Sequence, residues 1–186
     1  MKQHLRFEAV VLALVLATMA LVSLRPAYAA PAQVIDQDAQ AALEALYAST
    51  PGAKALGAQA KAILVFPYIH KAALVVGAQS GDGVMFRSGR IIGHYRVDGL
   101  LAGLEAGAQS YGYALFFMSD AALETMRKAK GLEIGADPNI VIVDAGAAKE
   151  VSTSTLQADV YGYVFNQKGL MGGIALQGLK ITKTDR

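Results

Sequence analysis

The chain has 186 residues, of which 54% are hydrophobic and 17% are charged, and it contains no cysteine. This length suits a single domain with one hydrophobic core. Without cysteine the chain cannot form disulfides, zinc or iron–sulfur sites with thiolate ligands, or a thiol nucleophile. The formal net charge is only +2 at pH 7, and the bases lack an aromatic platform or a basic recognition helix, so a nucleic-acid partner is not expected.

Residues 1–29 are typical of a secretion signal. Lys2 and Arg6 form a basic start, an uncharged apolar run of 16 residues follows, and small residues precede a cleavage point after Ala29. The run is shorter than the about 20 residues that a membrane-spanning helix needs, although an uncleaved anchor is the alternative. We therefore expect an exported protein of the periplasm or envelope, with one folded domain over residues 30–186.

The charges of this expected domain are segregated along the chain. Residues 30–186 carry 14 bases and 14 acids, but residues 49–97 carry six bases against Asp82 alone. Residues 98–159 are acidic, and residues 160–186 are basic again. If the two basic stretches meet in the fold, they form a positive surface suited to an anionic partner such as a membrane. Solvated charges scattered over the surface are the alternative.

Helix patterns open the expected domain. Asp36 or Asp38 can cap a helix whose apolar stripe continues to Tyr47. Thr50 and the proline after it favour the start of a second, short helix that ends near Gly57.

Strand patterns follow from residue 62 onward. The expected strands before the third helix cover residues 62–66, 72–79, 84–87, 90–97, 100–109 and 111–118, with turns at 81–83 and 88–89. Ser119 caps a helix over residues 120–130, and later strands are expected at 132–135 paired with 140–143, in a hairpin over 159–177, and at 179–182. Gly99, Gly103 and Gly107 share one strand face, where the sheet can bend. These elements predict an α+β domain: a curved antiparallel sheet or small barrel of about eight short strands with two or three helices.

Enzyme signatures are missing from the sequence. It has no Gly-x-Ser-x-Gly elbow, no phosphate-binding P-loop, no His-Glu-x-x-His motif and no dinucleotide fingerprint. After residue 29 only His70 and His94 remain, so a zinc site with three imidazoles cannot form within one chain. We therefore expect no enzymatic activity, no cofactor and no metal, although carboxylates from distant positions could still meet.

Arg87 and Arg90 form the most pointed local pattern. If Ser88 and Gly89 make a two-residue hairpin turn, the two arginines are directly opposed, and alternation then places Arg90 on one face with His94 and Arg96. Opposed like charges cost stability unless both splay into water or a phosphate lies between them. Both possibilities stay open.

Several segments, in order along the chain, resemble the SYLF domain. They are residues 61–67, 77–86 around Gly81-Asp82-Gly83, 103–110, 132–137 and 168–173, within a match from about 41 to 183. The resemblance implies a non-enzymatic phospholipid-binding module, exported in bacteria. Eukaryotic relatives bind phosphoinositides and some bind actin, which an exported protein would not meet in its own cell. The sequence departs from the family at residues 143–146, where Gly-Pro is usual, and at Met171, where an aromatic is usual.

The sequence therefore predicts peripheral binding of anionic phospholipid, such as phosphatidylglycerol or cardiolipin, through a basic surface patch. The expected headgroup contacts are Lys61, Lys71, Arg87, Arg90, Arg96 and Lys168. A structural or protein-interaction component of the envelope, with possible self-association, is the alternative. Insertion of Leu170 and Met171 into the bilayer is a lesser alternative.

Overall fold

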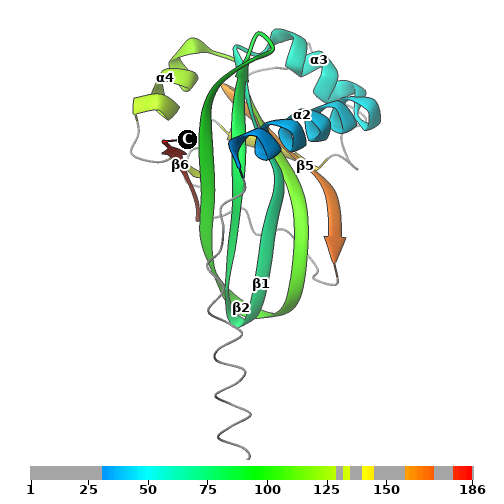
Figure 1. Ribbon diagram of the computed structural model, residues 1–186. Coiled ribbons are helices and arrows are strands. Elements are labelled where there is room, and N and C mark those ends of the chain that lie inside the picture. The colour runs from blue at the N-terminus through cyan, green and yellow to red at the C-terminus, as the bar shows by residue number, and fades with distance from the viewer. Residues whose placement is uncertain (1–30, 129–131, 135–139, 145–157, 170–177, 186) are drawn as a thin grey trace, which may run out of the picture. The chain divides into compact units, whose positions relative to one another are not determined.

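The computed structural model describes residues 31–128, 132–134, 140–144, 158–169 and 178–185, all within the unit formed by residues 31–186 (Figure 1). The expected signal segment, residues 1–29, lies outside the described residues, as do Leu170 and Met171 of the expected hairpin over residues 159–177. The described elements are α2 (Ala32–Ser49), α3 (Pro51–Gln59), β1 (Ala62–Arg87), β2 (Arg90–Phe117), α4 (Asp120–Lys128), β3 (Leu132–Ile134), β4 (Ile140–Asp144), β5 (Val160–Gly169) and β6 (Leu179–Thr184).

All three expected helices are present. α2 begins after Pro31, so Asp36 and Asp38 both lie inside the helix and the prediction that one of them caps it is wrong. α3 begins at Pro51 as predicted, because proline suits the first turn, where its missing N–H is not needed. At α4 the hydroxyl of Ser119 accepts a hydrogen bond from the backbone N–H of Ala122 at 3.1 Å, which confirms the predicted cap.

The six strands expected before α4 are in fact two long antiparallel strands, β1 and β2. The predicted turn at residues 81–83 is wrong, because these residues pair in register with residues 95–97 of β2. Glycine pairs usually indicate a turn, but here they allow close packing instead. Pro67 falls at a register shift between Phe66 and Ile69, where the ladder does not need its missing N–H.

The β1–β2 ribbon doubles back on itself (Figure 1). We call residues 72–78 of β1 and 99–108 of β2 the bend, and Ser88 with Gly89 and their neighbours the turn end. At the bend one residue of β1, Val75, lies opposite three residues of β2, 103–105. The two halves of β1 pack closely, since a Cβ on Gly81 would collide with the carbonyl oxygen of Tyr68. The expectation that the sheet bends near Gly99, Gly103 and Gly107 agrees with this geometry.

The described sheet has six strands, in the order β3-β6-β2-β5-β4, and β1 pairs with β2 off this path. The predicted pairing of residues 132–135 with 140–143 is wrong: β3 pairs with β6, and β4 pairs in parallel with β5. The local pattern could not show these pairings, because the partners of β3 and β4 are not each other but the later strands β6 and β5. The predicted fold class, an α+β domain with a curved sheet, is confirmed, with fewer and longer strands than expected.

The two faces of the sheet carry two separate cores. Leu64 and Phe66 face one core, which also contains Leu123 and Met126 of α4. Their neighbours on β1, Ile63 and Val65, face the other core, which is covered by α2 and α3. Strand alternation therefore explains why the apolar run 62–66 is buried on both faces.

Candidate functional site

The structure places the six predicted headgroup contacts in three different settings rather than in one patch. Lys61, Arg87 and Arg90 are exposed at the turn end. Arg96 and Lys168 lie farther along the ribbon toward the bend, and the side chain of Lys71 is buried.

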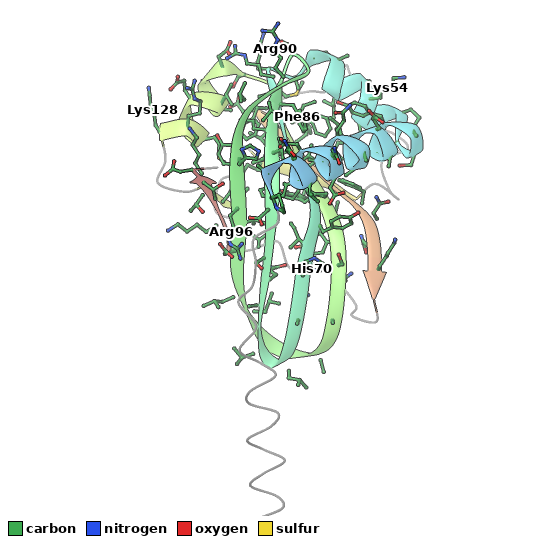
Figure 2. All side chains as sticks on the ribbon, in the orientation of Figure 1. Lys54, His70, Phe86, Arg90, Arg96 and Lys128 are labelled. Atoms are coloured by element: carbon green, nitrogen blue, oxygen red, sulfur yellow. The ribbon has the colours of Figure 1, made fainter. Side chains whose placement is uncertain are left out.

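The turn end holds the predicted arginine pair. Ser88 and Gly89 have φ values of +49° and +73°, as a type I′ turn requires, and Arg87 lies directly opposite Arg90 in the ladder. Arg87 Nη2 donates a hydrogen bond to Asp120 Oδ1 of α4 at 3.2 Å. Among the described residues no carboxylate forms an ion pair with Arg90, which extends at one end of the domain (Figure 2).

The prediction that Arg90 shares a face with His94 and Arg96 is wrong. Between the turn and His94 the ladder shifts by one residue, because β2 carries an extra residue between Ile91 and Gly93. This bulge reverses the alternation. His94 Nε2 instead lies 2.8 Å from Asp36 Oδ1 of α2, on the helix-covered face.

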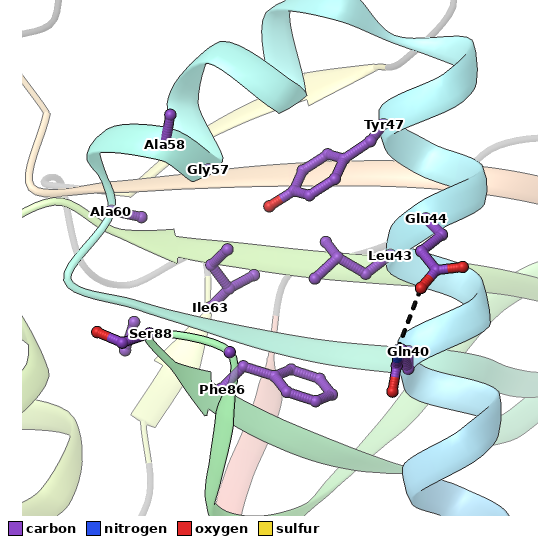
Figure 3. A pocket seen from close by; sticks show the side chains of 12 residues that line it. Gln40, Leu43, Glu44, Tyr47, Gly57, Ala58, Ala60, Ile63, Phe86 and Ser88 are labelled. Carbon is purple, nitrogen blue, oxygen red and sulfur yellow. Dashed lines mark hydrogen bonds between the residues drawn. The ribbon is translucent and has the colours of Figure 1, made fainter.

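A pocket of about 470 Å³ lies beside the turn end, between α2, α3 and β1 (Figure 3). The pocket is lined both by the neighbours of Lys61, Ala60 and Ala62, and by the turn residues Ser88 and Gly89. Lys61 therefore lies at the same end of the domain as the arginine pair. The apolar wall of the pocket comes from α2 and β1 and consists of Leu43, Tyr47, Ile63 and Phe86. The size falls within the usual range of ligand pockets.

Polar groups line one side of this pocket. Gln40 Nε2 donates a hydrogen bond to Glu44 Oε1 at 3.2 Å (Figure 3). The Tyr47 ring packs against Gly57, where a Cβ would collide with it. Burial raises the pKa of the Tyr47 hydroxyl above its usual range, so this group stays a neutral hydrogen-bond donor. The pocket can hold an apolar group with a polar end.

Arg96 is half-exposed and tied to two carboxylates. Its Nε donates to Asp98 Oδ1 at 3.0 Å, and its Nη1 lies 3.5 Å from Asp82 Oδ1. The pair with Asp98 is exposed and contributes about 0–1 kcal/mol, so a phosphate can compete with it.

Lys168 and Lys71 lie on adjacent register rows but face opposite ways. Lys168 of β5 is exposed and pairs with Ser110, which in turn pairs with His70. Lys71 is 1% exposed, inside the folded ribbon, so it is not one of the exposed bases. The same interior holds a hydrogen bond of 2.7 Å from the Tyr111 hydroxyl to Gln79 Oε1.

The described residues contain no group of three or more histidine, aspartate and glutamate side chains placed to bind a metal. Of the described helices, none combines the length and apolar character needed to cross a bilayer.

Sequence reasoning missed two features of this domain. The pocket was missed because its walls come from α2, α3 and the turn end, which are far apart in the sequence. The second is a group of exposed aliphatic side chains at the bend, including Leu74 and Leu100. The sequence does contain a signal for these exposed aliphatic side chains, because residues 72–81 and 99–104 carry no charge.

The structure defines a class of protein: a curled α+β domain built on one doubled-back ribbon, with α2 and α3 over one face and α4 packed against the core of the other. Residues 98–186 match the family model Ysc84, described as Las17-binding protein actin regulator, and this part of the chain is a SYLF-family domain. The match begins within β2 and extends over α4 and β3 to β6, so the predicted resemblance is confirmed there. No curated protein matches the chain.

Proposed function

We propose that this protein is a non-enzymatic, exported domain of the cell envelope that binds anionic phospholipid peripherally. The observation that supports the proposal is that four of the six predicted bases are exposed and a fifth, Arg96, is partly exposed. The proposed headgroup contacts are Lys61, Arg87, Arg90, Arg96 and Lys168.

Electrostatics supports this assignment. Each base near an anionic membrane surface contributes about 1 kcal/mol before screening by salt. Arginine also binds phosphate oxygens through paired donors, so Arg87 and Arg90 can share one phosphate across the turn. The ion pair of Arg87 with Asp120 is exposed on both sides, with 45% and 65% of the side chains accessible. Because such a pair contributes little, a headgroup can displace the carboxylate.

The proposed location follows from the N-terminal segment, whose basic start and apolar run are typical of a secretion signal. The description of the matched family names an actin regulator that binds the protein Las17. An exported domain would not meet actin in its own cell, so we propose membrane lipid as the partner of this chain.

Sedimentation with vesicles tests the proposal. The wild-type domain, residues 30–186, should bind vesicles containing phosphatidylglycerol and leave neutral phosphatidylcholine vesicles largely unbound. Binding should weaken as salt is raised, because exposed charges are screened beyond about 8 Å at physiological ionic strength. Replacing the five bases together by glutamine should lower the affinity by about two orders of magnitude.

A matched control keeps the test specific. Arg127 and Lys128 of α4 are also exposed, and both pair with Glu124 of the same helix at 3.8 and 3.5 Å. The double variant R127Q/K128Q should lose less affinity than R96Q/K168Q, which removes the same charge. Equal binding of neutral and anionic vesicles by the wild type would overturn the electrostatic proposal.

A protein-interaction role is the second candidate, because the family description names a protein partner. In this case the chain would form a structural component of the envelope or associate with itself. Gel filtration separates the two candidates. A self-associating domain elutes as an oligomer in the absence of lipid, and charge reversal at Arg87 and Arg90 leaves that state unchanged.

A further inference from the structure

The bend of the β1–β2 ribbon has an unusual outer surface. On β1 the side chains alternate, so that Ala73 and Gln79 point inward and are buried, whereas their neighbours point outward. Leu74, Val76 and Leu100 are 79%, 70% and 84% exposed. Among the bend residues whose side chains the structure describes, those exposed on this outer row are alanine, valine and leucine, and we call them the bend surface: Ala72, Leu74, Val76, Ala78, Leu100, Ala106 and Ala108.

Polar side chains begin at the next register row on each half of the ribbon. On one half His70, Ser110 and Lys168 form a row across β1, β2 and β5. On the other half Ser80, Asp98 and Lys180 form a row across β1, β2 and β6. His70 is four positions from Leu74, which is about 13 Å along a strand. The bend surface is therefore an apolar end with a polar collar.

A second copy of the chain does not suit this surface. A fully exposed aliphatic side chain presents on the order of 100 Å² to water, so the whole bend surface presents on the order of 400 Å². Two such surfaces in contact would bury less than about 1,000 Å², which is small for a stable interface. The surface is also convex, because the ribbon folds back at this point (Figure 1). Two convex surfaces bury even less, whereas a fluid bilayer can close around one.

We propose that the bend surface inserts into a lipid bilayer, just below the headgroups, where the hydrocarbon region begins. This inference rests on the proposed function, to which it adds the end of the domain that enters the membrane. With Leu74, Val76 and Leu100 below the headgroups, the collar lies at the level of the phosphates. Lys168 belongs to that collar. Arg96 lies two residues from Asp98 on β2, on the same face and farther from the bend. Of the proposed headgroup contacts, only these two then lie near the membrane, whereas Lys61, Arg87 and Arg90 lie at the opposite end of the ribbon. The contacts with this membrane therefore narrow to Arg96 and Lys168.

The bend surface can be made polar without disturbing the core, because its side chains are already exposed. The variant L74Q/V76T/L100Q should bind anionic vesicles about a hundredfold more weakly than the wild type, and its unfolding midpoint in urea should stay unchanged. A control makes the same kinds of change at exposed aliphatic residues elsewhere. Val34, Ile91 and Ile92 are 45%, 41% and 42% exposed, and V34T/I91Q/I92Q should bind like the wild type.

A fluorescent probe reports insertion directly. Because the chain has no cysteine, Val76→Cys gives a single site for an environment-sensitive dye, and Lys54→Cys on α3 gives the control. The dye at position 76 should shift to the blue on phosphatidylglycerol vesicles and keep the shift at high salt once bound, while the dye at position 54 stays in water.

The outcomes separate this inference from the proposed function. Binding to anionic vesicles with an unshifted dye at position 76 would overturn insertion and leave the proposed function standing. A shifted dye on neutral and anionic vesicles alike would support insertion and overturn the anionic preference. Absence of binding to either kind of vesicle would overturn both.

Discussion

One face of the β1–β2 ribbon is covered at the turn end and open at the bend. Near the turn end Val65 and Val84 lie under α2 and α3, where both are fully buried. On the same face at the bend, Val76 is 70% exposed. No helix of the described chain covers the bend (Figure 1). Aliphatic residues thus occur along the whole face, but only half of that face belongs to the core. Apolar composition alone does not distinguish a core position from a contact surface.

The close approach of the two halves of β1 is the feature whose loss should cost the most. A side chain at Gly81 would collide with the backbone of Tyr68, and backbone cannot move aside cheaply. Gly81→Val should therefore lower the free energy of unfolding by about 3 kcal/mol or prevent folding. At Gly89 nothing lies within 4 Å of an added Cβ, and its φ of +73° suits asparagine. Gly89→Asn should cost less than about 1 kcal/mol by urea denaturation, and a larger loss there than at Gly81 would contradict this account of how the two halves of β1 pack.

The same substitution on the same face should then differ between the two ends. Val65→Thr places a hydroxyl in a fully buried site and should lower the free energy of unfolding by about 1–3 kcal/mol. Val76→Thr should change it by less than about 0.5 kcal/mol, since the side chain is already in contact with water. Urea denaturation of the two variants measures the contrast. Equal losses would mean that the bend surface is packed in the folded protein.

Alkaline pH should give a smaller effect that reports on the interior of the ribbon. Burial raises the pKa of Tyr111 and Tyr113 above the usual value of 10, so the folded state holds these protons more tightly than the unfolded state. Their contribution to stability is complete below pH 10 and is lost as the pH rises above it, by up to about 1.4 kcal/mol per pH unit for each group.

Phenylalanine variants separate the two tyrosines. The Tyr113 hydroxyl has no hydrogen-bond partner among the described residues, so Tyr113→Phe should leave stability at pH 7 unchanged within about 1 kcal/mol and reduce the alkaline loss. Tyr111→Phe removes the bond to Gln79 and should cost about 1 kcal/mol at pH 7. Urea denaturation at pH 7 and at about pH 11 tests both, and an alkaline loss that persists unchanged in the two variants would assign it to other groups.

Local patterns predicted the parts of this domain that depend on neighbouring residues. The start of α3 at Pro51, the cap of α4 at Ser119 and the tight turn at Ser88 and Gly89 were all predicted, because capping and turn geometry are set within a few residues. The partners of β3 and β4 were not predicted. Strand pairing is decided by contacts between distant segments, which a single sequence does not reveal.

For the candidate site, the sequence determined which residues are basic and where the uncharged apolar runs lie, along with the family of residues 98–186. Only the tertiary structure decided how each side chain is used. It enclosed Lys71 within the folded ribbon, tied Arg96 to two carboxylates, and left Leu74 and Leu100 in contact with water. The physical reason is that burial depends on which surfaces pack together, and here the ribbon doubles back while its helices cover only one end.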